Sequence, residues 1–215
     1  MAGLRKIVWA VAVAAALAGC VGEDDSEPGE EKSANLKTPG GLIAALSDRA
    51  GQGDVDGLVE LLTKEARAQG TKAWMGFISR TGSKQVRDPI AKLPAEQRGQ
   101  FDGLTTRRFL EKLQELAPGA FSRLFLFYPE DQYEEEGRVL VYAGNAGGEI
   151  VYLGMRRTAD ETLRLMGEKQ SAEVYEAYRD ALARQQREEA REKARKAQEA
   201  LEELRQQREE GRTEE

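Results

Sequence analysis

The sequence predicts an α+β fold in which N-terminal helices pack on a small antiparallel sheet, followed by a long charged C-terminal helix. Apolar residues recur at helical spacing through the first half of the chain, up to a helix expected to open at Thr106. Strand-like runs separated by a glycine-rich loop come next. From Ser171 to Gly211 there is no proline and no internal glycine, and good helix formers dominate. Helices first and strands second are typical of the α+β class.

Three apolar clusters precede Thr106. The first two predict helices: the first is expected to stop at Gly51, and Asp54 is expected to cap the second. The third cluster fits either a helix or a short strand. The clusters are Leu42, Ile43 and Leu46; Val55, Leu58, Leu61 and Leu62; and Trp74, Met75, Phe77 and Ile78. Residues 82–103 are polar and hold Pro89 and Pro94, so we expect a loop with at most one helical turn.

A further helix and the sheet complete the expected domain. The helix that opens at Thr106 is expected to end at residues 117–119, Ala-Pro-Gly. The strands are expected within residues 121–128, 138–142, 150–155 and 161–166. The Gly/Asn loop between the second and third runs predicts a β-hairpin. Both hairpin strands are apolar on both faces, so we expect one face to pack on the helices and the other to line a pocket or a partner surface.

The N-terminus has the pattern of a secretory signal. Arg5 and Lys6 precede an uninterrupted apolar run from Ile7 to Ala18. A helix of this length extends roughly 18 Å, which is short for a bilayer core about 30 Å thick. The basic flank and the length are those of a signal peptide, and we assign residues 1–19 to it.

The run ends in Leu17-Ala18-Gly19-Cys20, which resembles the lipobox of bacterial lipoproteins. The resemblance implies that diacylglycerol is attached to the Cys20 thiol, that cleavage falls between Gly19 and Cys20, and that the new amino group is acylated, for example with palmitate. It places the protein at the cell membrane or outer membrane, with the domain facing the periplasm or exterior. Val21, in place of the aspartate that marks inner-membrane retention in enterobacterial lipoproteins, favours the outer membrane. The alternative is an ordinary signal peptide in which the only cysteine of the chain falls there by chance.

Residues 20–40 are expected to form an acidic, flexible tether. They hold six acidic residues, and Val21 and Leu36 are the only large apolar residues after the cysteine. Such a disordered segment buries too little apolar surface to offset its ordering entropy. It would span about 25 Å and hold residues 41–170, the globular domain, off the membrane. A calcium site is the other interpretation, but the acids lack the ligand spacing and the fixing glycine of such sites.

The expected domain also resembles the NTF2-like superfamily. The matching stretches are residues 50–62 (AGQGDVDGLVELL) and the hairpin at 138–155. The insert at 80–104 departs from the usual pattern. The last strand usually holds a tryptophan, whereas residues 163–166 here are LRLM. The resemblance implies a cone-shaped cavity and says nothing about chemistry.

Composition excludes several function classes. The net charge is −6, which argues against general nucleic-acid binding because phosphate neutralisation needs a basic surface. The chain has no histidine and one cysteine, which excludes His-dependent triads, His or Cys-rich zinc sites and internal disulfides. We therefore predict no cofactor and no catalytic, cofactor-binding or metal residue.

Four local patterns suggest sites but favour structural interpretations. Gly51, Gly53 and Gly57 form GxGxxxG after a helix, whereas a nucleotide loop needs GxGxxG after a strand. The loop at 52–57 lacks two ligands of a calcium loop, so its aspartates are better read as a cap and a first-turn acid. Residues 134–136, three glutamates, are expected in a solvated turn. Tyr142 and Tyr152 are expected to face each other across the hairpin, as packing rather than as a polar pocket pair.

The segment 171–215 is expected to be one helix, capped by Ser171. Its i,i+4 charge pairs each contribute about 0.2–0.5 kcal/mol. The expected pairs are Asp180–Arg184, Arg184–Glu188, Glu189–Lys193 and Glu192–Lys196. A 4-3-4-3 spacing runs through Ala190, Ala194, Ala197, Leu201 and Leu204. Only two heptads are continuous, so a solvated single helix and a coiled coil or partner-docked helix both remain open. Residues 172–182 are expected to pack on the domain, and the rest to project.

These features predict a lipid-anchored bacterial envelope protein with a binding or scaffolding role. Residues 186–215 would contact an envelope protein partner or self-associate weakly, and nucleic acid is not an expected partner. The alternative is a ligand carrier or enzyme that uses an NTF2-like cavity.

Overall fold

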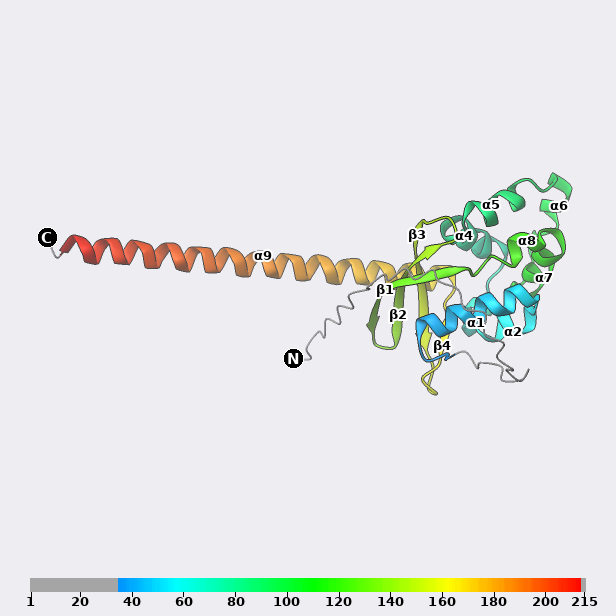
Figure 1. Cartoon of the computed structure of the whole chain (residues 1–215), viewed down its shortest axis with the longest axis horizontal. Coiled ribbons are helices and arrows are strands. Elements are labelled where there is room, and N and C mark those ends of the chain that lie inside the picture. The colour runs from blue at the N-terminus through cyan, green and yellow to red at the C-terminus, as the bar shows by residue number, and fades with distance from the viewer. Residues whose placement is uncertain (1–34, 214–215) are drawn as a thin grey trace, which may run out of the picture. The chain divides into compact units, whose positions relative to one another are not determined.

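The computed structural model describes residues 35–213, and side-chain environments as far as residue 203. The chain in this range is α+β, as predicted, with eight helices before a four-stranded sheet and one long helix after it (Figure 1). The expected signal peptide, Cys20 and the tether up to residue 34 lie outside the described residues. The elements are α1 Pro39–Gln52, α2 Val55–Glu60, α3 Lys64–Arg67, α4 Thr71–Thr81, α5 Lys84–Ala91, α6 Ala95–Gly99, α7 Thr106–Leu116, α8 Pro118–Phe121, β1 Phe127–Glu135, β2 Arg138–Asn145, β3 Ile150–Arg157, β4 Leu163–Leu165 and α9 Glu168–Thr213.

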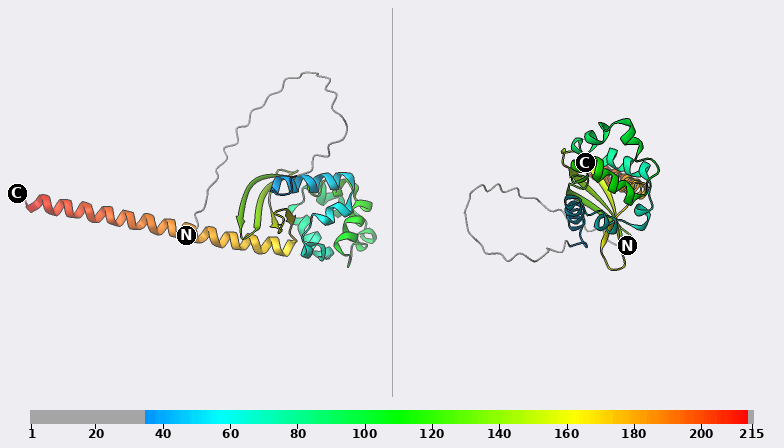
Figure 2. Two further views of the ribbon diagram at one scale, coloured as in Figure 1. Left: turned by 90° about the horizontal axis from the view of Figure 1, so that it is seen from below. Right: turned by 90° about the vertical axis from the view of Figure 1, so that its right-hand side faces the viewer.

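The sheet is antiparallel, with strand order β1-β2-β3-β4. Side chains alternate between its faces along each strand. One face packs on the N-terminal helices and the other on the first turns of α9, so the strands lie between α1 and α9 (Figure 2). This explains why β2 and β3 are apolar on both faces. The residues of β2 and β3 on the face that packs on the N-terminal helices are Val139, Val141, Ala143, Val151, Leu153 and Met155.

The core under the helices is rich in aromatic rings. Trp74 of α4 lies against Phe77, Phe109 and Phe125, with ring centroids 5.5–6.4 Å apart. The Trp74 indole N–H donates to the Thr106 hydroxyl at 2.8 Å, and that hydroxyl donates to the carbonyl of Ala66. The helix predicted after Thr106 is confirmed as α7, and the cluster around Trp74 forms a helix rather than a strand.

Two predicted segments were wrong because the prediction gave a local sequence signal more weight than the spacing of the apolar residues. Residues 82–103 contain α5 and α6 rather than a loop. Val86 and Ile90, four residues apart, bury one side of α5, and this packing outweighs the backbone hydrogen bond that Pro89 removes.

The expected strand at 121–128 begins only at Phe127. The preceding residues form α8 and turns. Phe121, Leu124 and Phe125 are buried, and their i, i+3, i+4 spacing is that of a helical turn. The aromatic content of this run favours a strand, but the spacing of its apolar residues places them on one side of a helical turn.

Three expected boundaries also move. The first helix continues past Gly51 and ends before Gly53, which has a left-handed φ of 72°. The helix α9 begins at Glu168, so Ser171 lies inside it instead of capping it. At the other end, Leu36 packs against the core and its carbonyl accepts a hydrogen bond from Leu163 N–H. Ordered structure therefore begins within the segment expected as tether.

Candidate functional site

The most distinctive feature of the described chain is the junction that fixes α9 to the sheet. Tyr142 and Tyr152 are register partners across the β2–β3 hairpin, as the sequence predicted. Tyr152 stacks on Tyr175 of α9, with ring centroids 4.3 Å apart and an interplanar angle of 6°. Tyr178, one turn further along α9, contacts Tyr142 and Tyr133 at centroid distances of 6.0 and 4.8 Å. We refer to these five rings as the tyrosine cluster.

An arginine from α4 ties the start of α9 to the same place. The Arg80 guanidinium donates two hydrogen bonds to the Glu168 carboxylate, at 2.9 and 2.7 Å. It also donates to the Tyr152 carbonyl and lies 4.1 Å from the centroid of the Tyr152 ring. Both side chains are about four-fifths buried, which makes a bidentate pair stronger than one on the open surface. Glu168 is also favourably placed as an acid in the first turn of α9.

The helix and the sheet approach closely at Gly154. The Ser171 hydroxyl accepts a hydrogen bond from Gly154 N–H at 3.3 Å. A Cβ at Gly154 would lie 2.7 Å from the Ser171 Oγ and 2.8 Å from its Cα. Only a glycine lets α9 lie this near to β3, so Gly154 is required for the close packing of the helix on the sheet.

Three hydroxyls of the cluster, those of Tyr133, Tyr142 and Tyr152, are held in their neutral form. Burial, with a further contribution from Tyr178, raises the pKa of Tyr142 to about 12. Burial also raises the pKa of Tyr133 and of Tyr152. A tyrosinate base would need a lowered pKa, so these three rings are suited to packing and hydrogen bonding. This agrees with the structural interpretation of the Tyr142–Tyr152 pair.

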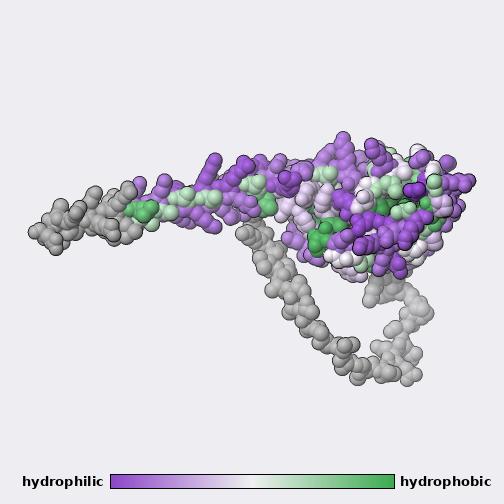
Figure 3. Space-filling model, turned by 90° about the horizontal axis from the view of Figure 1, so that it is seen from above, coloured by the Kyte–Doolittle hydropathy of each residue, from purple (hydrophilic) through white to green (hydrophobic). Residues whose placement is uncertain are grey.

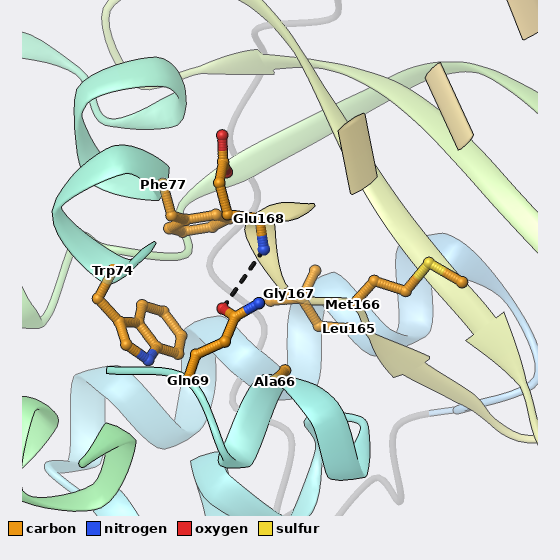
Figure 4. A pocket seen from close by; sticks show the side chains of 8 residues that line it. All are labelled: Ala66, Gln69, Trp74, Phe77, Leu165, Met166, Gly167 and Glu168. Carbon is orange, nitrogen blue, oxygen red and sulfur yellow. Dashed lines mark hydrogen bonds between the residues drawn. The ribbon is translucent and has the colours of Figure 1, made fainter. Parts of the chain in front are cut away.

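A small pocket lies beside the junction. It is lined by residues of α3 and α4, by Gln69 between these two helices and by residues 165–168, and Figure 4 shows the Gln69 side chain directed towards Gly167. Gln69 Oε1 accepts a hydrogen bond from Glu168 N–H at 3.4 Å, which satisfies one of the free amide groups at the start of α9. The pocket has a volume of about 10 Å³, the room of one water molecule.

The carboxylates considered as sites have structural partners. Asp54 caps α2 by accepting from Gly57 N–H at 2.8 Å and also pairs with Arg49. Asp56 pairs with Arg107 at 2.6 Å. Among the side chains that the structure describes, up to residue 203, no group of three or more acidic or thiol side chains is placed to hold a metal ion.

The glutamates at 134–136 were expected to form one solvated turn, and this prediction is wrong. Glu134 and Glu135 belong to β1, and Glu134 pairs with Arg157 at 2.8 Å. The turn itself is Glu136 and Gly137, both with positive φ. The β1–β2 pairing continues as far as Glu135 and Arg138. Only two residues remain between the strands, so the turn is shorter than the run of three glutamates suggested.

Past the junction, α9 has little contact with the domain. Tyr175 and Tyr178 are partly buried, whereas every residue from 186 to 203 is exposed. Figure 3 shows patches of hydrophobic colour along this part of the helix between hydrophilic side chains. Of the four expected charge pairs, Glu192–Lys196 forms, at 2.8 Å. Glu189 instead accepts from Gln185, and Arg184 donates to the backbone carbonyl of Asp180.

Sequence reasoning found part of this junction. The hairpin register followed from the strand pattern. Residues 172–182 were expected to pack on the domain, and Val174, Tyr175 and Tyr178 do so, whereas Leu182 is exposed. Arg80 was missed, because nothing in its neighbourhood of α4 marks a partner 88 residues away. Glu168 was missed because it was placed before the start of the helix.

Comparisons of the chain with protein families, with curated proteins and with solved structures give no match. In residues 35–213, none of the helices combines the length and the apolar character needed to cross a membrane.

Proposed function

We propose that this protein is a lipid-anchored bacterial envelope protein whose domain presents α9 as a binding or scaffolding element. The observation that supports the binding role is the contrast along α9. Its first turns are fixed by the tyrosine cluster, by Arg80 and by the close approach at Gly154, while residues 186–203 are exposed. A helix that is held at one end and solvated at the other gives a partner a preformed surface, which lowers the ordering cost of binding.

The alternative, a ligand carrier or an enzyme, depends on a cavity. The pocket beside Gln69 has room for one water molecule, whereas sites for small ligands are clefts of about 300–1,000 Å³. The space between the sheet and the N-terminal helices is filled by side chains such as Val139 and Leu153, each at most 1 % exposed. The filled face of the sheet favours the binding role, and we propose it as a non-enzymatic one.

The anchor rests on the sequence at residues 17–20. We propose that Cys20 carries diacylglycerol and an amino-terminal acyl chain, and that the protein resides in the cell membrane or outer membrane. Two or more acyl chains hold a protein firmly at a bilayer, whereas one binds only marginally.

The anchor is tested with Cys20→Ala in a bacterial host supplied with labelled fatty acid. The wild-type chain should take up label and sediment with membranes. The variant should lose the label, and should either leave the membrane fraction or accumulate unprocessed. Label that persists in Cys20→Ala would overturn the lipoprotein assignment and leave the binding role of α9 untouched.

A further inference from the structure

The charges of distal α9 are sorted around the helix. We define the ridge as Ala190, Ala194, Ala197 and Leu201, which fall along one side at 3.6 residues per turn. On the same geometry Arg187 and Lys193 flank the ridge on its two sides, and Arg191 borders it. The glutamates between residues 183 and 203 all lie on the opposite half of the helix. They are Glu188, Glu189, Glu192, Glu199, Glu202 and Glu203.

The cations on the two halves differ in their partners. On the glutamate half, Arg195 pairs with Glu199 at 3.5 Å and Lys196 pairs with Glu192 at 2.8 Å. Beside the ridge, the three flanking cations form no ion pair within the described residues. Leu201, in the ridge, is 58 % exposed. The ridge half is therefore an unpartnered helix face that combines small apolar side chains with uncompensated positive charge.

From this charge pattern we propose that the ridge binds an acidic helix of another envelope protein, one that carries carboxylates beside its own apolar seam. The proposal deepens the binding role given above and rests on it. Small side chains let two helices approach to the short end of the usual 8–10 Å interaxial range. At that separation, side chains beside the seam meet across it, as the e and g residues of coiled coils do.

Two other occupants match this face less well. A second copy would bring Arg187, Arg191 and Lys193 against a ridge half with no glutamate between residues 183 and 203, in either helix orientation. A membrane surface would satisfy the cations, but helices that lie in bilayers bury Trp, Phe and Leu, whereas the ridge offers three alanines and one leucine. The acidic helix is the occupant that uses both the small ridge and its charge.

The test uses the chain itself as the source of an acidic helix. The variant Arg187→Glu/Arg191→Glu/Lys193→Glu keeps the ridge and the domain but reverses the flanking charges. Full chains are purified in a nonionic detergent, and fluorescence anisotropy measures binding of one labelled chain to the other. Wild type should bind the charge-reversed chain at least about tenfold more tightly than it binds wild type, since three pairs change from repulsion to attraction. Raising the salt should reduce this preference.

The matched control is Arg195→Glu/Lys196→Glu, which reverses two cations on the opposite half. Wild type should show no such preference for it, and a preference equal to that for the first variant would overturn the ridge as the binding face. Equal binding of wild type to itself and to the first variant would identify a second copy as the occupant and overturn the proposal.

A membrane occupant is tested separately. The peptide of residues 183–204 is mixed with phosphatidylglycerol vesicles and with neutral phosphatidylcholine vesicles, and its helicity is followed by circular dichroism. A gain of helicity on the anionic vesicles, together with no preference for the charge-reversed chain, would overturn the acidic-helix proposal in favour of lipid. If that preference is missing but removal of residues 186–215 still abolishes binding to a partner, the proposal fails while the binding role stands.

Discussion

Gly154→Ala should weaken the seat of α9 on the sheet. The new methyl group would meet Ser171 at 2.7 Å from Oγ and 2.8 Å from Cα. The second contact is to backbone, so rotation of the serine side chain cannot relieve it. Overpacking of this kind typically costs about 1–3 kcal/mol. Replacing a strand glycine with alanine would by itself stabilise by roughly 0.5–1 kcal/mol. We therefore expect a net loss of about 1–2 kcal/mol.

Urea unfolding of the two proteins measures this loss, and near-UV circular dichroism reports the tyrosine cluster. The spectrum should change, because displacing α9 separates Tyr175 from Tyr152. Gly119→Ala in α8 is the matched control: a Cβ there meets nothing within 4 Å, so stability should be unchanged or slightly higher. A Gly154→Ala protein that is as stable as this control, with an unchanged spectrum, would refute the close seating of α9.

Two further predictions concern the core and the cluster. Leu113→Ala should lower the free energy of unfolding by about 2–5 kcal/mol in denaturant melts, because Leu113 is completely buried in α7; a loss below about 0.5 kcal/mol would place the residue on the surface. Because the folded-state pKa of Tyr142 is raised from 10 to about 12, its stabilising contribution should be complete below pH 10 and decline as the pH rises from 10 to 12. Ultraviolet titration of tyrosinate should show a late-ionising group that Tyr142→Phe removes, and its persistence in that variant would contradict the assignment.

Much of the fold was readable from residue spacing. The helix after Thr106 follows from one continuous apolar stripe, and the hairpin from two apolar runs around a Gly/Asn loop. In both cases local pattern and tertiary packing agree. At 82–103 they conflict: Pro89 is a strong local signal, and the burial of Val86 and Ile90 overrides it.

The junction was less predictable because its contacts are distant in sequence. The Arg80–Glu168 pair joins residues 88 positions apart, and an arginine on a helix carries no mark of its partner. Gly154 shows the same limit, because a glycine within a strand indicates a close approach without naming the neighbour. The charge sorting of α9, in contrast, is a property of the sequence, and the exposure of residues 186–203 shows that this face is available.

The most direct test of the central claim removes residues 186–215. The claim is that this part of α9 serves binding and contributes nothing to the fold, since its described side chains are exposed. Changes confined to exposed residues typically alter stability by no more than about 0.5 kcal/mol. The truncated chain should therefore match the full chain in urea unfolding within that margin, while binding to the charge-reversed chain is lost. A loss of several kcal/mol, or binding that survives the deletion, would contradict the account.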